Sequence, residues 1–366
     1  MPRLPRRSAL GLEALFAAGA RQALPGEFTR RAFLNGRMDL AQSEAVIDLI
    51  DAETGEAARN AYGQLAGALS RRVEQVYSGL TDVMAHFHAV LDYPDEDLDP
   101  FTVQGLDQAI CQALQGLEDL LSTYDRGSML TEGVPCAIVG RPNVGKSSLL
   151  NALLGYERAI VTPIPGTTRD TLEERVRLGG VLLRLTDTAG LRSSDDPVER
   201  LGVQRSRAAI ESARLVLAVL DGSQSLTEED RAALKAAETA PACICVVNKA
   251  DLPPALDQRE LSGRQVCVLS ARTGQGLENL EQAVAQCFPQ GADPAGSLLT
   301  NARQAEAVTR AREHLLTAQD GLAAGVTPDA LLTDVEQAMD CLGQLTGRSV
   351  REDITERIFS RFCVGK

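Results

Sequence analysis

Residues 140–147 read Gly-Arg-Pro-Asn-Val-Gly-Lys-Ser, and this stretch decides the fold of the chain around it. It matches the pattern G-x-x-x-x-G-K-S, follows the apolar run 136–139 and opens a run of good helix formers at 148–154. A strand, a glycine-rich loop and a helix in this order bind phosphate, because the glycines let backbone N–H groups curl around it. We therefore predict a nucleotide site in which Lys146 meets the outer phosphates and the Ser147 hydroxyl holds Mg²⁺.

Short apolar runs alternate with amphipathic stretches around this loop. The runs are residues 136–139, 181–185, 215–220, 243–247 and 266–269. Such alternation is typical of an α/β domain with a doubly wound, mainly parallel sheet. We therefore predict a P-loop domain of this fold over residues 131–290.

Helical periodicity flanks this domain on both sides. Apolar residues recur every three or four positions from Leu65 to Val90, which indicates one face of a long helix, and again from Ala305 to Leu345. Neither flank alone supplies a complete core. We therefore expect the α/β domain to be inserted into an all-α helical domain made of residues 37–130 and 291–366.

Two motifs near the ends of later runs indicate guanine. Residues 248–251 read Asn-Lys-Ala-Asp, and residues 270–272 read Ser-Ala-Arg. In the N-K-x-D pattern the aspartate accepts two hydrogen bonds from guanine, a pair that adenine does not offer. An ordinary turn is the alternative for Asn248 and Asp251, since both residue types favour turns. The order and spacing of the motifs favour a GTPase.

Two segments between these motifs resemble GTPase switches. Residues 187–190, Asp-Thr-Ala-Gly, resemble the D-x-x-G motif that senses the γ-phosphate. Residues 166–170, Gly-Thr-Thr-Arg-Asp, resemble switch I, with Thr168 as a second magnesium ligand. A solvent-exposed polar loop is the alternative for Thr162, Thr167 and Thr168. The whole predicted GTP site comprises Asn143, Val144, Gly145, Lys146, Ser147, Ser148, Thr162, Pro163, Ile164, Pro165, Gly166, Thr167, Thr168, Asp187, Thr188, Ala189, Gly190, Asn248, Lys249, Ala250, Asp251, Ser270, Ala271 and Arg272.

The residue after the second switch glycine is Leu191. Ras-like enzymes place a glutamine there to orient the attacking water. An aliphatic side chain cannot hydrogen-bond to water. Another residue must therefore orient the water, and another positive charge must stabilise the transition state.

Composition limits the other function classes. The net charge of −13 over 366 residues argues against a general nucleic-acid coat, which would be basic. The early arginines 30, 31 and 37 and the late arginines 348, 351, 357 and 361 leave open a local basic face or a solvated surface. The eight scattered cysteines form no C-x-x-C pair, and no apolar stretch is long enough to span a membrane. We therefore expect a cytoplasmic protein with reduced thiols.

From about residue 10 to the end, the chain resembles the MnmE family of tRNA-modification GTPases, also called TrmE. The resemblance is carried by PGEFTRRAFLNG at 25–36, DLAQ at 39–42, the GTPase motifs and the tail RIFSRFCVGK at 357–366. It implies that K⁺ replaces an arginine finger. The ligands would be the Asn143 side chain with Thr162, Ile164 and Thr167, and Glu199 would orient the water. From the residues alone, which place Glu199 on a polar stretch after the second switch, a surface glutamate is the favoured interpretation.

The resemblance also implies partners and a second ligand. It implies G-domain dimerisation, a homodimer and joint action with the FAD-dependent protein MnmG on the wobble uridine of certain tRNAs. Cys363 would belong to the tRNA-modifying centre, although by sequence it is also compatible with a packed or surface thiol. Arg37 and Lys366 match positions in the family's 5-formyltetrahydrofolate pocket. Residues 1–36 match only the last segment of its α+β folate-binding domain, so we expect an incomplete pocket and a weakened dimer.

Two alternatives stay open on the sequence. One is an Era-like ribosome-assembly GTPase, which would lack the FCVGK tail and usually carries a basic RNA-binding domain. The other is a non-catalytic scaffold in which GTP only sets the conformation.

Overall fold

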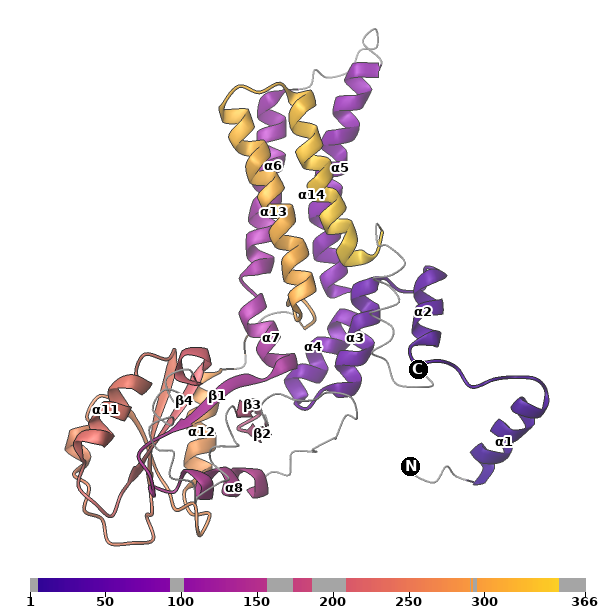
Figure 1. Ribbon diagram of the computed structural model, residues 1–366. Helices are drawn as coiled ribbons and strands as arrows, with labels where there is room; N and C mark the ends of the chain where they lie inside the picture. Colours follow the sequence, from indigo (N-terminus) through magenta and orange to yellow (C-terminus); the bar gives the residue numbers. More distant parts are fainter. Residues whose placement is uncertain are drawn as a thin grey trace.

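The computed structural model describes residues 6–92, 102–156, 174–185, 209–289, 291 and 295–348. They form an α/β domain with a helical bundle beside it (Figure 1). The α/β domain is built on a six-stranded sheet in the order β2-β3-β1-β4-β5-β6. Its strands are β1 (Val134–Val139), β2 (Glu174–Leu178), β3 (Val181–Leu185), β4 (Leu215–Asp221), β5 (Ala242–Asn248) and β6 (Gln265–Val268).

All neighbouring strands are parallel except β2 and β3, which form an antiparallel hairpin. The predicted mainly parallel sheet is therefore confirmed, with one strand more than the apolar runs indicated. Strand β2 was not predicted, because polar residues alternate with apolar ones along it and it contains no apolar run. A turn of two glycines with positive φ, Gly179 and Gly180, joins β2 to β3 and is the sequence signal for such a hairpin.

Helices cover both faces of the sheet. Helices α8 (Lys146–Tyr156) and α12 (Leu277–Cys287) pack on one face, and α11 (Glu228–Ala237) packs on the other. Alternate residues of β1 therefore belong to two cores: Cys136 and Ile138 face the first, Ala137 and Val139 the second. All seven residues of β4 are buried, as expected of a central strand in a parallel sheet. A short 3-10 helix, η1 (Gln258–Leu261), precedes β6.

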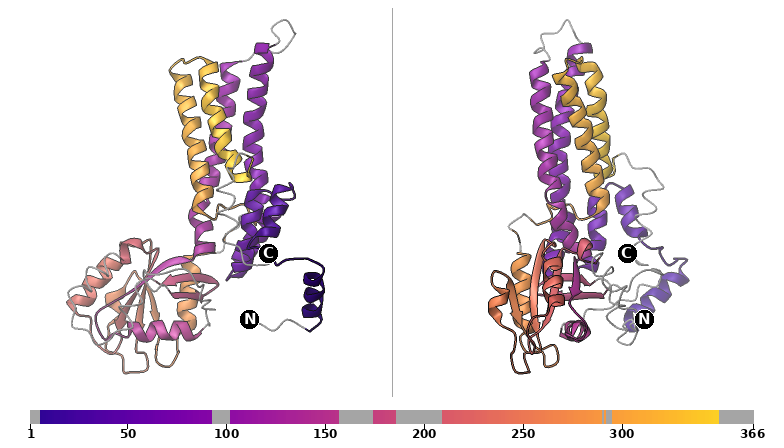
Figure 2. Two further views of the ribbon diagram at one scale, coloured as in Figure 1. Left: turned by 45° about the vertical axis from the view of Figure 1, so that its right-hand side comes forward. Right: turned by 60° about the vertical axis from the view of Figure 1, so that its left-hand side comes forward.

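Four long helices form the bundle: α5 (Ala68–Asp92), α6 (Val103–Leu121), α13 (Ala302–Ala323) and α14 (Pro328–Thr346). Two come from each side of the α/β domain, and Figure 2 shows them as one upright bundle. Their shared core includes Leu80, Leu117, Leu315 and Leu342, each fully buried. This core confirms the predicted insertion of the α/β domain into a helical domain.

The long helix begins three residues later than its apolar face suggested. Leu65 ends a separate helix, α4 (Gly55–Leu65), and Gly67, with φ of 82°, turns the chain before α5 starts at Ala68. Helices α3 (Leu40–Asp51) and α7 (Tyr124–Glu132) complete the region where the bundle meets the α/β domain. Asp39 starts α3 with a capping box to Gln42.

The chain enters and leaves the α/β domain through one polar junction. Helix α7 leads into β1, and residues 295–301 lead back to α13. The returning segment is bound by Gln64, whose amide donates to the Leu298 carbonyl at 2.6 Å, and by Asn60, which accepts from the Gly296 N–H at 3.1 Å. A Cβ atom added at Gly127 of α7 would collide with the Leu299 carbonyl. The two ends of the inserted domain are thus fixed side by side.

Two ion pairs span the same junction. Arg175 on β2 pairs with Glu53 at 3.1 Å, and Arg214 before β4 pairs with Asp125 on α7 at 2.8 Å. These are partly exposed pairs, so each contributes at most about 1 kcal/mol.

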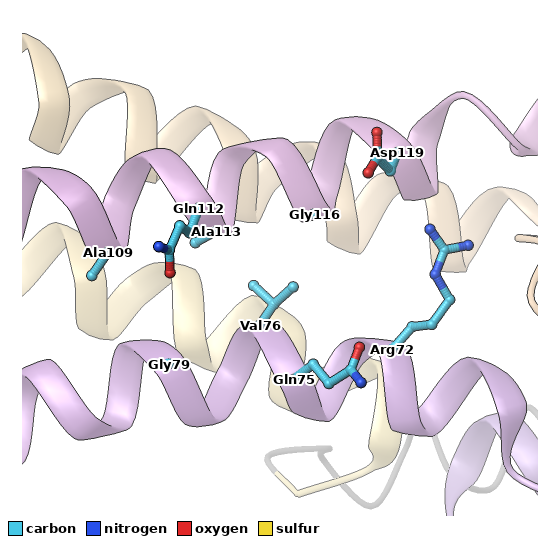
Figure 3. A pocket seen from close by; sticks show the side chains of 9 residues that line it. All are labelled: Arg72, Gln75, Val76, Gly79, Ala109, Gln112, Ala113, Gly116 and Asp119. Atoms are coloured by element: carbon cyan, nitrogen blue, oxygen red, sulfur yellow. The ribbon is translucent and has the colours of Figure 1, made fainter.

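The first two helices, α1 (Arg6–Ala17) and α2 (Glu27–Leu34), lie at the edge of the molecule (Figure 1). Leu10, Leu15, Phe28 and Leu34 on them are all exposed by more than half. A pocket of about 420 Å³ lies between α5 and α6, where Figure 3 shows Arg72 and Asp119 at one end. No described helix combines the length and apolarity needed to cross a membrane.

Candidate nucleotide site

Four segments meet at the carboxyl ends of the neighbouring parallel strands β1, β4, β5 and β6. Residues 140–147 follow β1, Asp221 ends β4, residues 249–251 follow β5, and residues 270–272 follow β6. In open α/β sheets this edge is where ligands bind. The fold therefore brings together all the predicted GTP motifs that fall within the described residues.

The phosphate-binding loop depends on two glycines. Gly140 has φ of 146°, and a Cβ atom there would collide with the Val219 carbonyl of β4. Gly145 has φ of 99°, and a Cβ atom there would collide with the side-chain nitrogen of Asn248. Both positions need a residue without a side chain, for conformation and for space.

Among the described residues, a left-handed backbone at a residue other than glycine occurs only at this site. Asn143 and Lys249 are the only described residues other than glycine with positive φ, at 64° and 66°. A left-handed backbone is unfavourable for most residues and least so for asparagine. The two strained positions lie one in each of the predicted phosphate and guanine motifs, and strain of this kind concentrates at functional sites.

Lys146 lies at the first turn of α8 and is tied to its own loop. Its Nζ donates to the Gly140 carbonyl at 2.6 Å and to the Arg141 carbonyl at 2.9 Å. Burial lowers the pKa of Lys146 below its ordinary value. The next residue, Ser147, is half-buried at the same helix start, where the backbone N–H groups and the helix dipole favour anions.

Asn248 connects three of the predicted motifs. Its side chain is nearly fully buried, donates to the Val144 carbonyl at 2.9 Å and accepts from the Ala271 N–H at 2.9 Å. The asparagine thereby fixes the phosphate-binding loop against the loops after β5 and β6. Its amide serves as a structural bridge in this arrangement.

Lys249 forms an ion pair with a residue that the motifs did not include. Its Nζ lies 2.6 Å from Oδ2 of Asp221, whose side chain is only 2% exposed. Burial alone would raise the pKa of Asp221, but hydrogen bonds from Lys249 and Ser223 outweigh it and lower that pKa. The position of Asp221 at the carboxyl end of a buried strand is the signal that could have revealed it.

Asp251 is held by both residues expected to support it. The Ser270 hydroxyl donates to Oδ1 at 2.6 Å, and the Arg272 guanidinium donates to Oδ2 at 2.6 Å. These hydrogen bonds, that from Ser270 first, lower the pKa of Asp251. The carboxylate is thus kept ionised and able to accept hydrogen bonds.

Arg141 and Asp230 form a further ion pair that sequence reasoning missed. Nε of Arg141 lies 3.2 Å from both carboxylate oxygens of Asp230, and its guanidinium also donates to Gln224 at 2.7 Å. Asp230 belongs to the capping box that starts α11 with Thr227. The T-x-x-D pattern would have marked a helix start, although nothing in it points to the phosphate-binding loop.

Arg37 lines a different pocket, of about 510 Å³, far along the chain from the GTP motifs. Arg71 and Arg348 line it too, so three guanidinium groups border one space. Arg348 also pairs with Glu74 at 2.6 Å and lies over the Tyr77 ring. This pocket lies at the end of α14, where the chain continues toward its tail.

Several predicted residues lie outside the described part of the chain. They are the switch residues 162–168 and 187–190, with Leu191, the proposed water-orienting Glu199, and Cys363 and Lys366 of the tail. The seven cysteines that the structure describes are free thiols, and the described residues contain no cluster of His, Cys, Asp and Glu that could hold a metal ion.

The chain is similar to known proteins over nearly its whole length. A family model described as the MnmE helical domain matches residues 40–363. A protein of Chloroflexus aurantiacus named tRNA modification GTPase MnmE is 48% identical over 98% of this chain and 79% of its own length. A protein of Roseiflexus sp. with the same name is 46% identical over 97% of this chain and 79% of its own length. The crystal structure of the G domain of the T. maritima FeoB iron transporter matches 42% of this chain and 98% of that chain, with 27% identity and a TM-score of 0.31.

Proposed function

The chain belongs to the MnmE family of tRNA modification GTPases, and from this premise we propose that potassium assists its hydrolysis of GTP in the modification of the wobble uridine. Membership in this family decides against the Era-like and scaffold alternatives. The observation that carries the GTP-binding part of the proposal is the Asn248 bridge, which ties the phosphate-binding loop to the loops that would bind guanine.

Asp251 would recognise the base. Its ionised carboxylate accepts hydrogen bonds from guanine N1–H and from the amino group. Ser270 would keep its hydrogen bond to Oδ1, whereas Arg272, whose side chain is exposed, would release Oδ2 to the incoming base. The side chain of Lys249, which pairs with Asp221, would flank the bound base.

Lys146 and the loop amides would bind the phosphates. An ammonium group has three N–H donors, and two of them are used by the loop carbonyls, so one remains for a phosphate oxygen. Ser147 and Thr168 offer the hydroxyl oxygens that suit Mg²⁺. The bound cation would neutralise charge on the outer phosphates.

Asn143 suits a potassium ligand because its side chain is exposed at the loop, and no hydrogen bond to it occurs among the described residues. Backbone oxygens of Thr162, Ile164 and Thr167 would complete the ligand set. The ion supplies the positive charge that an arginine finger gives to other GTPases. Glu199 would orient the attacking water, which Leu191 cannot do.

The reaction served would add an aminomethyl or carboxymethylaminomethyl group to carbon 5 of the wobble uridine, in the cytoplasm and together with MnmG. Hydrolysis would drive a conformational change and supply no transferred atoms, with Cys363 near the modifying centre. Arg37 and Lys366 would contribute to a 5-formyltetrahydrofolate site, and the three arginines around the Arg37 pocket suit the carboxylates of that ligand. The exposed apolar side chains of α1 and α2 support a homodimer, in which the G domains also pair.

GTP turnover in KCl and in NaCl at equal ionic strength tests this mechanism. We expect turnover to be at least ~10-fold faster in K⁺, because the ion stabilises charge in the transition state. Asn143→Ala should lose this difference while keeping GDP affinity within about threefold, since the loop glycines and Lys146 remain. Equal turnover in the two salts would rule out the potassium mechanism.

Glu199→Gln and Glu199→Ala test the water-orienting residue. Both should lower kcat by roughly 100-fold or more without raising KM, because the role concerns only the transition state. An alanine variant with unchanged turnover would remove Glu199 from the mechanism.

A further inference from the structure

We propose that Arg141 is a positioning residue for nucleotide binding, because the buried Asp230 of α11 fixes it and so holds the phosphate-binding loop in its binding shape. The inference rests on the proposed nucleotide site and adds two residues, Arg141 and Asp230, that the motif pattern leaves unspecified.

The ion pair is enclosed and well supported. The side chain of Arg141 is 17% exposed and that of Asp230 only 3%. Nε of Arg141 lies 3.2 Å from both carboxylate oxygens, and the outer guanidinium nitrogen donates to Gln224 at 2.7 Å. A guanidinium bound at two points has little freedom, because its planar fork presents its donors in fixed directions.

The Asp230 carboxylate is itself held by hydrogen bonds within the start of α11. Oδ2 of Asp230 accepts from the Thr227 N–H at 3.0 Å and from the Thr227 hydroxyl at 2.8 Å. Leu234 and Ala237 of the same helix are buried against the sheet. Asp230 is therefore anchored to the domain core and not to a surface loop.

The backbone of Arg141 is the part that faces the nucleotide site. Its carbonyl and that of Gly140 accept both observed hydrogen bonds from Lys146. Gly140 in turn lies directly against the backbone of β4. The ion pair that holds the Arg141 side chain thus also fixes the peptide that orients the ammonium group of Lys146. A loop that is already in its binding shape loses less conformational entropy when it binds phosphate.

Arg141→Gln and Asp230→Asn test this role by displacement of a fluorescent GDP analogue. Asparagine can still accept from Thr227, so the cap of α11 is retained. We expect each variant to raise the Kd of Mg–GDP at least ~10-fold and the Kd of GMP less than threefold, because the loop and Lys146 act mainly on the β-phosphate. Arg141→Lys should recover part of the affinity, since an ammonium can pair with Asp230 without reaching Gln224.

Two comparisons separate positioning from general destabilisation. Arg231, also on α11, forms ion pairs with Glu228 and with Glu260 of η1. Arg231→Gln removes both pairs and should leave the Kd of GDP within twofold. The double variant Arg141→Gln/Asp230→Asn should bind no more weakly than either single variant, because both remove one interaction. Folded Arg141→Gln protein with wild-type GDP affinity, or equal weakening of GDP and GMP, would overturn the inference. Wild-type protein that binds no guanine nucleotide would overturn the proposed function itself.

Discussion

At the scale of single residues, the site is a set of polar side chains whose partners are already in place. Asp251 has a donor on each oxygen, Asn248 makes one hydrogen bond with each side of its amide, and Asp221 neutralises Lys249. Buried polar groups that are fully paired hold one geometry, because any shift leaves a group unsatisfied. Guanine specificity then depends on the hydrogen bonds that the Asp251 carboxylate can accept from the base.

Asp251→Asn should reverse the base preference. The amide would donate to the carbonyl that xanthine carries in place of the guanine amino group, and would lose the double acceptor for guanine. We expect GTP affinity to fall by at least ~100-fold and xanthosine triphosphate to become the better ligand in a competition assay. Asp257→Asn, at the start of η1, is the matched control and should keep GTP preference. Retained GTP preference in the Asp251 variant would contradict this assignment.

Asp48 on α3 gives a pH-dependent prediction. Burial first, and then the nearby Glu44, raises the pKa of Asp48 to about 6, and the Thr300 hydroxyl partly opposes the rise. An acid whose pKa is raised by folding binds more protons in the folded state than in the unfolded state. The contribution of protonated Asp48 to the free energy of unfolding is therefore full below the pKa of the unfolded state and is lost as the pH rises through about 6.

Asp48→Asn should therefore stabilise the helical domain by roughly 1–2 kcal/mol at pH 7.5 and by less than half as much at pH 4.5. Thermal unfolding at the two pH values measures this. Asp51→Asn, an exposed carboxylate on the same helix, should change stability by less than about 0.5 kcal/mol. A pH-independent gain at Asp48 would argue for a cause other than ionisation.

At the scale of elements, close backbone approach decides how α7 meets the returning segment 295–301. Gly127→Ala should destabilise the helical domain by roughly 2 kcal/mol or more, because the added methyl group would meet the rigid Leu299 carbonyl. Gly79→Ala on α5 is the matched control. No atom lies within 4 Å of its added Cβ, so better helix propensity should stabilise α5 by about 1 kcal/mol. Thermal melts with GDP present separate this transition from that of the nucleotide domain.

The elements differ in how far the sequence could predict them. Strands such as β4 were predictable because both faces are buried and every residue is apolar or terminal. Strand β2 was not, because it is an edge strand whose exposed side chains include Arg175 and Arg177. The helix break at Gly67 was not predicted, because the three- and four-residue spacing of apolar residues continues across it. In the candidate site, the phosphate and guanine motifs could be predicted because each is a short contiguous stretch of sequence. The Arg141–Asp230 ion pair could not, because its two residues are far apart in the chain and only the fold brings them together.

At the scale of the whole molecule, the helical bundle is built from two pairs of helices that the nucleotide-binding domain separates in sequence. Both pairs contribute to one core, and the inserted domain is attached at one place through α7 and residues 295–301. Any movement of the inserted domain must act on this junction, where Arg175 and Arg214 also pair with Glu53 and Asp125.

The shared core also sets an order of events during protein synthesis. About 180 residues separate the end of α6 from the start of α13. At ~5–20 residues per second, the ribosome takes roughly 10–40 s to make them. During that interval the apolar faces of α5 and α6 are in the cell without α13 and α14, while the nucleotide-binding domain can complete its own fold. We therefore expect the nascent bundle to depend on chaperones and on the pace of translation more than the nucleotide-binding domain does.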